Sequence, residues 1–267
     1  MTPPAARHRR PRNQCQPALA AVSHGTSSPS GQQAIADLVA AVAQARADLE
    51  VAGGFVDVQQ PDVAATLNGL TPRSAAVVVP LLLSAGYHVH VDLRQETAAI
   101  DRPTTVSAAL GPDWRLVDVL AQRLSEAGYR LGDEIVLAAA GSSDARAVAD
   151  CHETGRMLAE RLGTRVGVGF LSAASPRLPC AVTIARIRTP AARVMISTYL
   201  MAPGYFLNLT ERAGADQVSS PLLVAHEAPP PVLVELVLDR YSAAVGNLPG
   251  ARTGDVSAEV RDRELIS

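Results

Sequence analysis

Two histidines and an aspartate are the side chains of this sequence that could hold a metal ion together. His24 lies in a Ser-His-Gly-Thr segment, Asp57 in Phe-Val-Asp-Val and His88 in Gly-Tyr-His-Val. Two imidazoles and one carboxylate suit divalent first-row ions such as Fe²⁺, Co²⁺, Ni²⁺ or Zn²⁺. A site with only three protein ligands stays open to a substrate. The residue types therefore predict a metal-handling site.

Each of these residues also has a purely structural interpretation. A histidine beside a glycine turn often belongs to the loop or caps a helix, and an aspartate at a strand end often caps the helix that follows. A structural role for all three stays open as an alternative. The remaining histidines are weaker candidates, because His90 would face away from His88 on a helix and His152 lies within an amphipathic segment.

Short apolar segments alternate with longer amphipathic segments along the chain. The segment at 75–83 is apolar on consecutive residues, as expected of a strand that is covered on both faces. Strands are expected at residues 18–23, 54–58, 75–83, 106–110, 134–140, 165–171 and 193–201, and helices at residues 33–49, 61–70, 89–100, 116–127, 145–162, 178–187 and 231–245. This alternation predicts an α/β fold of parallel sheets flanked by helices.

The two halves of the sequence match one another at three places. Residues 24–27 match 140–143, residues 54–57 match 169–172, and residues 80–88 match 198–206, at offsets of 115 to 118 residues. Three matches at nearly one offset predict a duplicated unit. Where the first half carries the candidate ligands, the second half carries side chains that cannot replace them: Ala140, Ser172 and Phe206. We therefore expect the first lobe to keep a site and the second to keep only the fold.

The duplication predicts how the chain is organised. We expect a disordered basic tail at residues 1–16, an N-terminal lobe that carries the site at 17–131, a degenerate C-terminal lobe at 132–246 and a polar tail at 247–267. The predicted fold class is α/β, with two tandem similar lobes, each a parallel sheet flanked by helices. Each candidate ligand follows the carboxyl end of a predicted strand or lies at it, which is where open parallel sheets bind ligands.

Composition excludes several classes of function. The 24 Lys and Arg residues are balanced by 26 Asp and Glu residues, so the chain has no overall basic field for nucleic acid. No apolar segment reaches the roughly 20 residues that span a bilayer, and the basic N-terminus lacks the apolar core of a secretory signal. The three cysteines are far apart and form no C-x-x-C pair. These features predict a cytoplasmic protein that binds neither nucleic acid nor a membrane.

Three motifs together resemble a known family. They are His-Gly-Thr at residues 24–26, Phe-Val-Asp-Val-Gln-Gln-Pro at 55–61, and Pro-Leu-Leu-Leu-Ser-Ala-Gly-Tyr-His-Val-His-Val-Asp at 80–92. In combination they are similar to the sirohydrochlorin chelatases of the CbiX and SirB type, which share the class II chelatase fold with cobaltochelatases and protoporphyrin ferrochelatase. The resemblance covers residues 18–94 well and the second half weakly.

The resemblance implies that His24, Asp57 and His88 hold the metal and carry the catalysis. The family more often has Glu at the position of Asp57, and it commonly has Arg where this sequence has Ser27. Asp92 matches the family's Asp four residues after its second His. Residues at this spacing share one face of a helix, so Asp92 would orient the His88 ring; an acidic residue on the helix surface stays open as the alternative.

The reaction that the resemblance implies is the insertion of a divalent metal into sirohydrochlorin, a tetrapyrrole with eight carboxylates. Fe²⁺ would give sirohaem and is favoured, whereas Co²⁺ would give cobalt-sirohydrochlorin for cobalamin biosynthesis. The enzyme would be a lyase with no permanently bound cofactor, because the metal ion is itself a substrate. Two pyrrolic protons leave as the metal enters, and histidine side chains, which titrate near neutral pH, can accept them.

A polyanionic substrate needs hydrogen-bond donors and positive charge. Thr26, Ser27 and Ser28 lie in a loop that is expected to lead into a helix N-terminus, where the aligned peptide dipoles favour a carboxylate. Arg94 would pair with a further carboxylate of the substrate. These four residues are the predicted substrate-binding residues.

Other functions fit the same residues less fully. A metal or tetrapyrrole carrier would use the same ligands without turnover, so it would bind metal or sirohydrochlorin without accelerating insertion. A hydrolase built on Ser23 or Thr26 with His24 is disfavoured, because the sequence has no G-x-S-x-G elbow. A dinucleotide-binding role fails because no G-x-G-x-x-G follows the first predicted strand.

Overall fold

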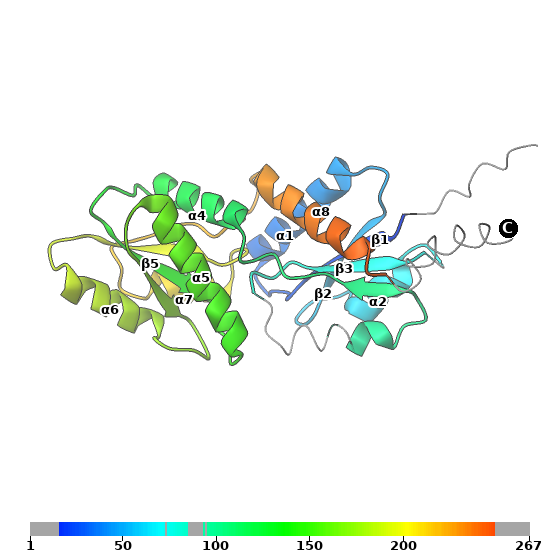
Figure 1. Cartoon of the computed structure of the whole chain (residues 1–267), viewed down its shortest axis with the longest axis horizontal. Coiled ribbons are helices and arrows are strands. Elements are labelled where there is room, and N and C mark those ends of the chain that lie inside the picture. Colours follow the sequence, from blue (N-terminus) through cyan, green and yellow to red (C-terminus); the bar gives the residue numbers. More distant parts are fainter. Residues whose placement is uncertain (1–15, 73, 85–92, 94, 249–267) are drawn as a thin grey trace, which may run out of the picture.

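Two sheets, each covered by helices, form the framework of the chain. The computed structural model describes residues 16–72, 74–84, 93 and 95–248. Figure 1 shows the two sheets next to one another along the long axis of the molecule. Several predicted features fall outside the described residues: His88, His90, Asp92, Arg94, most of the N-terminal tail and most of the C-terminal tail.

The first sheet contains β1 (Ala18–Ser23), β2 (Val51–Phe55), β3 (Ala76–Pro80) and β4 (Thr104–Val106). Its strand order is β2-β1-β3-β4, and every pairing is parallel. All residues of β1 and β3 are buried. Helices on both faces of the sheet explain why these two strands are apolar on consecutive residues.

The second sheet repeats this plan with β5 (Glu134–Ala139), β6 (Val166–Phe170), β7 (Val194–Tyr199) and β8 (Gln217–Val218). Its order, β6-β5-β7-β8, is the same, and its pairings are also parallel. The sequence does not predict β8, because two residues are too few to show a strand pattern. The predicted fold class, two tandem lobes with parallel sheets, is confirmed.

The position of β2 differs from the expected strand at 54–58. The pair Gly53-Gly54 suggests a turn by composition, but both glycines pair with β1 inside the sheet. Gly54 lies against α2, and a Cβ on it would be 2.3 Å from the Thr66 hydroxyl oxygen. Close packing of a helix on the strand therefore explains the glycine, and the loop begins just after Phe55.

Helices connect the strands: α1 (Pro29–Ala45), α2 (Val63–Gly69), α4 (Trp114–Glu126), α5 (Ala145–Leu162), α6 (Leu178–Arg188), α7 (Tyr205–Glu211) and α8 (Pro231–Val245). Residues 93 and 95–98 are also helical. The sequence allows α1 to start at Ser28-Pro29 or at a capping box of Ser30 with Gln33. The first start is confirmed and the second is wrong, because the Ser28 hydroxyl accepts from the Gly31 N–H and Pro29 is the first helical residue.

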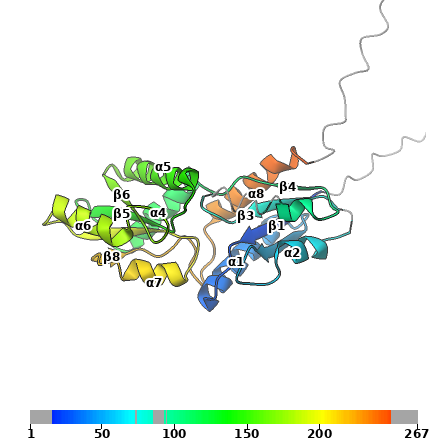
Figure 2. The same cartoon turned by 90° about the horizontal axis from the view of Figure 1, so that it is seen from below.

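The helices α4 and α8 are exchanged between the two halves of the chain. α4 packs against α5 and β7, whereas α8 packs against α1 and β3. Figures 1 and 2 show α4 beside α5 and α8 beside α1. Arg240 of α8 donates to the carbonyls of Ala109 and Leu110, both at 2.8 Å. The Tyr241 hydroxyl donates to the Pro17 carbonyl at 2.6 Å. The expected lobe boundary between residues 131 and 132 stays a prediction, and both helices pack across it.

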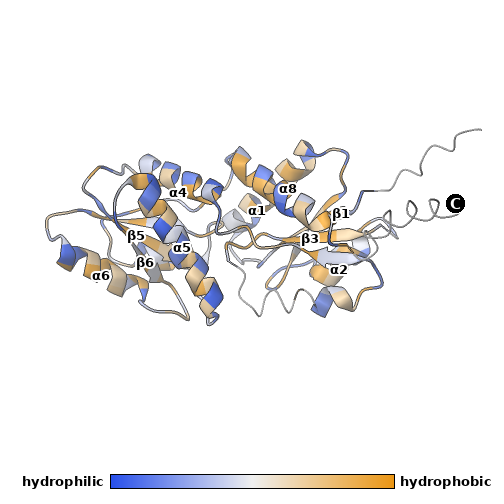
Figure 3. Ribbon diagram, in the orientation of Figure 1, coloured by the Kyte–Doolittle hydropathy of each residue, from blue (hydrophilic) through white to orange (hydrophobic). Residues whose placement is uncertain are grey.

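Apolar side chains fill the interior of both lobes. Figure 3 shows that the strands are mostly hydrophobic, whereas the helices carry both hydrophobic and hydrophilic residues. The largest buried cluster is continuous between the lobes, since it includes Leu19 of β1, Leu137 of β5 and Leu236 of α8. Two smaller clusters fill the opposite face of each sheet. None of the described helices combines the length and the apolar character that crossing a bilayer requires.

Candidate metal centre

The candidate ligands His24 and Asp57 meet at the carboxyl-terminal edge of the first sheet. They follow β1 and β2, which are parallel neighbours. The Asp57 N–H donates to the His24 carbonyl at 3.1 Å. Both residues are exposed. The structure therefore brings an accessible imidazole and an accessible carboxylate to the same rim, a donor pair suited to a divalent first-row ion.

Gly25 allows the two loops at this rim to touch. Its φ is +93°, in the left-handed region that favours glycine. A Cβ on Gly25 would lie 2.1 Å from the Asp57 carbonyl oxygen, which is too close for any side chain. Both its conformation and its contact with Asp57 therefore require glycine directly after His24.

The structural alternative for these residues is helix capping, and other residues do it. Ser28 caps α1, and Asp62 caps α2 by accepting from a backbone N–H at 2.7 Å. Asp57 Oδ1 instead accepts from the N–H of the adjacent Val58 at 2.7 Å. Within the described ranges, no hydrogen bond or ion pair engages the His24 ring. Helix capping therefore explains neither His24 nor Asp57.

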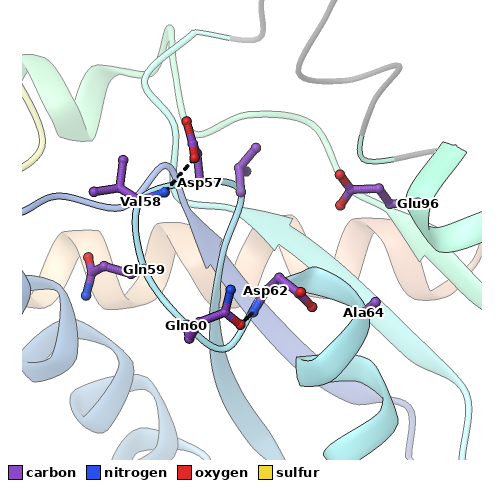
Figure 4. Close-up of a pocket in the computed structure, with 8 residues that line it drawn as sticks. Asp57, Val58, Gln59, Gln60, Asp62, Ala64 and Glu96 are labelled. Carbon is purple, nitrogen blue, oxygen red and sulfur yellow. Dashed lines mark hydrogen bonds between the residues drawn. The ribbon is translucent and has the colours of Figure 1, made fainter.

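An acidic cavity of about 600 Å³ opens beside Asp57 (Figure 4). Figure 4 shows the carboxylates of Asp57 and Glu96 reaching it from different segments of the chain. The loop after β2 forms most of the lining, which consists of Val56, Asp57, Val58, Gln59, Gln60, Asp62, Ala64 and Glu96. Sequence reasoning missed Glu96, because no motif links it to the candidate ligands. Glu96 brings a third carboxylate to the lining, in addition to those of Asp57 and Asp62.

The described residues contain two of the three predicted ligands. Among them, no three His, Cys, Asp or Glu side chains form a group that could hold a metal ion. The predicted third ligand, His88, lies outside the described residues, as do Asp92 and Arg94. The strand β3, which precedes this segment, pairs with β1 in parallel, so its carboxyl end lies at the same edge as His24.

Three of the four predicted substrate-binding residues, Thr26, Ser27 and Ser28, lie in the turn between His24 and α1. The Ser28 N–H donates to the Thr26 hydroxyl oxygen at 3.2 Å, and the Thr26 N–H donates to Gln59 Oε1 at 2.8 Å. The first of these hydrogen bonds lies within the turn and the second joins the turn to the loop that carries Asp57, whereas Ser27 is exposed. That Thr26, Ser27 and Ser28 bind a substrate stays a prediction.

Comparison with known proteins identifies the family. A family model described as CbiX matches residues 18–127 and 134–218, which include both sheets and well over half of the chain. The chain belongs to the CbiX family. The resemblance inferred from the three motifs is thus confirmed, and the match extends through the second half, where the motifs are weak.

Curated relatives of this CbiX-family chain are distant. The sirohydrochlorin cobaltochelatase of Methanosarcina acetivorans is 24% identical over 123 residues, which cover 41% of this chain and 95% of that protein. The protein of the same name from Methanosarcina barkeri is 23% identical over the same length. Because the alignment takes in nearly all of each relative but less than half of this chain, these relatives have about the length of one lobe.

Solved structures similar to this CbiX-family chain share its fold. SirB from Bacillus subtilis with Fe³⁺ is 21% identical with a TM-score of 0.70, and SirB from the subspecies spizizenii in complex with cobalt is 17% identical with a TM-score of 0.67. Each match covers 87% of this chain and 96% of the SirB chain. A CbiX described as the terminal enzyme of sirohaem biosynthesis in denitrifying bacteria is 20% identical with a TM-score of 0.62, over 85% of this chain and 99% of that one.

The second lobe of this CbiX-family chain repeats the backbone of the site without its ligands. The Ser172 N–H donates to the Ala140 carbonyl at 2.8 Å, as the Asp57 N–H does to His24. Gly141 has a φ of +92°, and a Cβ on it would lie 1.9 Å from the Ser172 carbonyl oxygen. The predicted duplication is therefore confirmed down to this turn.

Tyr199 links the second lobe of this CbiX-family chain to the segment between β3 and His88. Its hydroxyl donates to the Leu83 carbonyl at 3.0 Å. Burial raises the pKa of Tyr199, so the hydroxyl stays protonated and can donate this hydrogen bond. Burial likewise raises the pKa of Cys151 to about 11, so this cysteine is a neutral thiol near pH 7 and a poor metal ligand.

Proposed function

We propose that this chain inserts a divalent metal ion, Fe²⁺ or Co²⁺, into sirohydrochlorin. The observation that carries the proposal is the contact between the His24 and Asp57 loops at the rim of the first sheet, with both residues exposed. Membership of the CbiX family supports it, as do the two relatives named as sirohydrochlorin cobaltochelatases. The similar SirB structures contain Fe³⁺ in one case and cobalt in the other.

In the proposed reaction the metal ion is a substrate that His24, Asp57 and His88 receive before transfer. Sirohydrochlorin loses two pyrrolic N–H protons as M²⁺ enters, so the products are the metallated macrocycle and two protons. The Asp57 carboxylate offsets part of the ion's charge. Histidine side chains suit proton acceptance near neutral pH, and His24 and His88 divide metal delivery and proton removal between them.

The remaining predicted residues have supporting roles in this proposal. Asp92 is assigned the role of orienting the His88 ring. Thr26, Ser27 and Ser28 offer hydroxyl groups to the carboxylates of sirohydrochlorin, and the guanidinium of Arg94 pairs with another carboxylate. Of the two metals we propose iron, because sirohaem is the more widely needed product. The ligand types themselves accept Fe²⁺ and Co²⁺ alike.

The His24→Ala variant is expected to lose about 100-fold in metal insertion, because removal of a ligand should cost at least as much as removal of a group that only orients one. Purified protein is incubated anaerobically with sirohydrochlorin and either Fe²⁺ or Co²⁺, and absorbance follows the product. The control is His226→Asn, since His226 is exposed and does not line the cavity beside Asp57, and asparagine tolerates its φ of +64°. This control should insert metal at the wild-type rate.

Two results of that experiment would contradict the proposed function. A His24→Ala variant that inserts metal at the wild-type rate would show that His24 is not part of the metal site. A wild-type protein that binds metal without exceeding the spontaneous rate of insertion would indicate a carrier instead.

The Asp57→Asn variant is expected to raise the KM for the metal about tenfold and to leave the KM for sirohydrochlorin unchanged. Asparagine can still accept from the Val58 N–H, so the loop should keep its shape and the free energy of unfolding should change by less than about 0.5 kcal/mol. The matched control is Asp62→Asn, because Asp62 lines the same cavity and asparagine caps a helix as well as aspartate does. Equal effects of the two variants would show that only the overall charge of the cavity matters and would contradict a ligand role for Asp57.

A further inference from the structure

Two glutamine side chains hold the backbone of the turn that carries His24. Gln59 Oε1 accepts from the Thr26 N–H at 2.8 Å, and Gln32 Nε2 donates to the Thr26 carbonyl at 2.8 Å. Both backbone groups of Thr26, two residues after His24, are therefore bound by side chains. We call Gln32 and Gln59 the glutamine clamp.

The two glutamines come from different elements. Gln59 lies in the loop that also carries Asp57, and Gln32 lies in the first turn of α1. The bond from Thr26 to Gln59 thus connects the His24 turn directly to the Asp57 loop, in addition to the backbone bond between His24 and Asp57. The clamp fixes the separation of the two candidate ligands at a second point.

The second lobe tests whether the fold itself needs this clamp. Its equivalent turn keeps the hydroxyl contact, because the Asp144 N–H donates to the Ser142 hydroxyl oxygen at 3.0 Å, as the Ser28 N–H does to Thr26. The counterparts of Gln32 and Gln59, at offsets of 116 and 115 residues, are Val148 and Ala174. Neither of these side chains can form a hydrogen bond. The same turn therefore forms without a clamp in the lobe that lacks metal ligands.

We propose that Gln59 and Gln32 are positioning residues that set the distance between His24 and Asp57 for one metal ion. This inference rests on the proposed function, in which the two residues share the ion. A metal ion has strict ligand distances, and side chains that orient its ligands typically contribute 10- to 100-fold in metal affinity. The clamp is bonded to the backbone of Thr26, so its effect on the metal site is measured with the metal alone.

The polarity of the two hydrogen bonds makes the proposal testable with four variants. Gln59→Glu keeps an oxygen acceptor for the Thr26 N–H, whereas Gln59→Met loses it. Gln32→Glu loses the N–H donor for the Thr26 carbonyl, and so does Gln32→Met. Glutamate should therefore rescue position 59 and fail at position 32, a difference that no general effect of size or stability produces.

The measurement is titration of the full-length protein with Co²⁺ alone, followed by the visible absorption of the bound ion. Gln59→Met, Gln32→Met and Gln32→Glu are expected to raise the dissociation constant for Co²⁺ about tenfold, and Gln59→Glu to stay within about threefold of wild type. Steady-state assays should show a raised KM for the metal. Gln60→Met is the control, because Gln60 Oε1 accepts from the Asp62 N–H in the same loop but does not contact Thr26.

The outcomes separate this inference from the proposed function. If Gln59→Met and Gln32→Met bind Co²⁺ as wild type does, or if Gln60→Met weakens binding equally, the clamp does not position the ligands and the inference is overturned, while metal insertion by wild type can still stand. If wild type binds Co²⁺ in a His24-dependent way but does not accelerate insertion, the proposed function fails, and the four variants still decide whether the clamp positions the ion.

Discussion

Replacing Gly25 with alanine is expected to abolish metal insertion, whereas the equivalent replacement of Gly141 is expected to preserve it. Both glycines have φ near +92°, and at both a Cβ would lie about 2 Å from a carbonyl oxygen of the neighbouring loop. The left-handed conformation costs alanine about 1–2 kcal/mol, and the contact adds about 1–3 kcal/mol. The two variants should therefore lose similar stability.

Their effects on activity should differ because only one of the two turns carries ligands. Alanine at position 25 must move the Asp57 carbonyl away from the turn that holds His24, and a misplacement of about 1 Å can lower a rate about 100-fold. Gly25→Ala should therefore lose at least about 100-fold in insertion at a temperature where it is folded. Gly141→Ala moves Ser172, which has no proposed part in the reaction.

Thermal unfolding and the insertion assay are measured on the same preparations of Gly25→Ala and Gly141→Ala. Similar melting temperatures with insertion lost only in Gly25→Ala would support a site in the first lobe. Equal loss of insertion in both variants would contradict it, since the second turn would then be as important as the first.

Much of the fold can be predicted from the sequence, because local patterns and the duplication point to the same answer. The helices α5 and α8 have the predicted bounds, and both lobes have the predicted order of strands and helices apart from β8, which the sequence does not predict. The exchange of α4 and α8 between the lobes cannot be predicted from the sequence in this way. An amphipathic pattern shows that a helix has an apolar face, but it does not show which of two similar sheets that face will cover. Hydrogen bonds such as those from Arg240 to the carbonyls of Ala109 and Leu110 hold α8 on the first lobe.

The candidate site, too, can be predicted from the sequence only in part. Residue types and the comparison of the two halves identify His24 and Asp57, because chemistry that is present in one copy and missing from the other stands out in the sequence. The glutamine clamp leaves a weaker signal. Gln59 lies in one of the family-like motifs, but its partner Thr26 is 33 residues away, and only the folded backbone shows that the two are bonded. The sequence could have suggested Gln32 and Gln59 by their replacement with Val148 and Ala174.

Replacing Gly31 with alanine is expected to destabilise the protein, against the ordinary preference of helices. Alanine stabilises a helix interior by up to about 1 kcal/mol relative to glycine. Gly31 is in the first turn of α1, and a Cβ on it would lie 2.2 Å from the carbonyl oxygen of Pro203 in the second lobe. Relief of this contact requires backbone movement between the lobes, so we expect a net loss of about 2 kcal/mol. That loss corresponds to a melting temperature about 4–8 °C lower.

The reason lies in the packing of the lobes, because the helix position itself accepts alanine. Ala147 is the counterpart of Gly31 at the same place in α5, where it is buried. Gly69 in α2 is the matched control, since a Cβ there would meet nothing within 4 Å, and Gly69→Ala should be neutral or stabilising. Thermal unfolding of the two variants measures the difference. A Gly31→Ala variant as stable as Gly69→Ala would show that the second lobe does not press on the first turn of α1, which is the turn that holds Gln32 and follows the His24 loop.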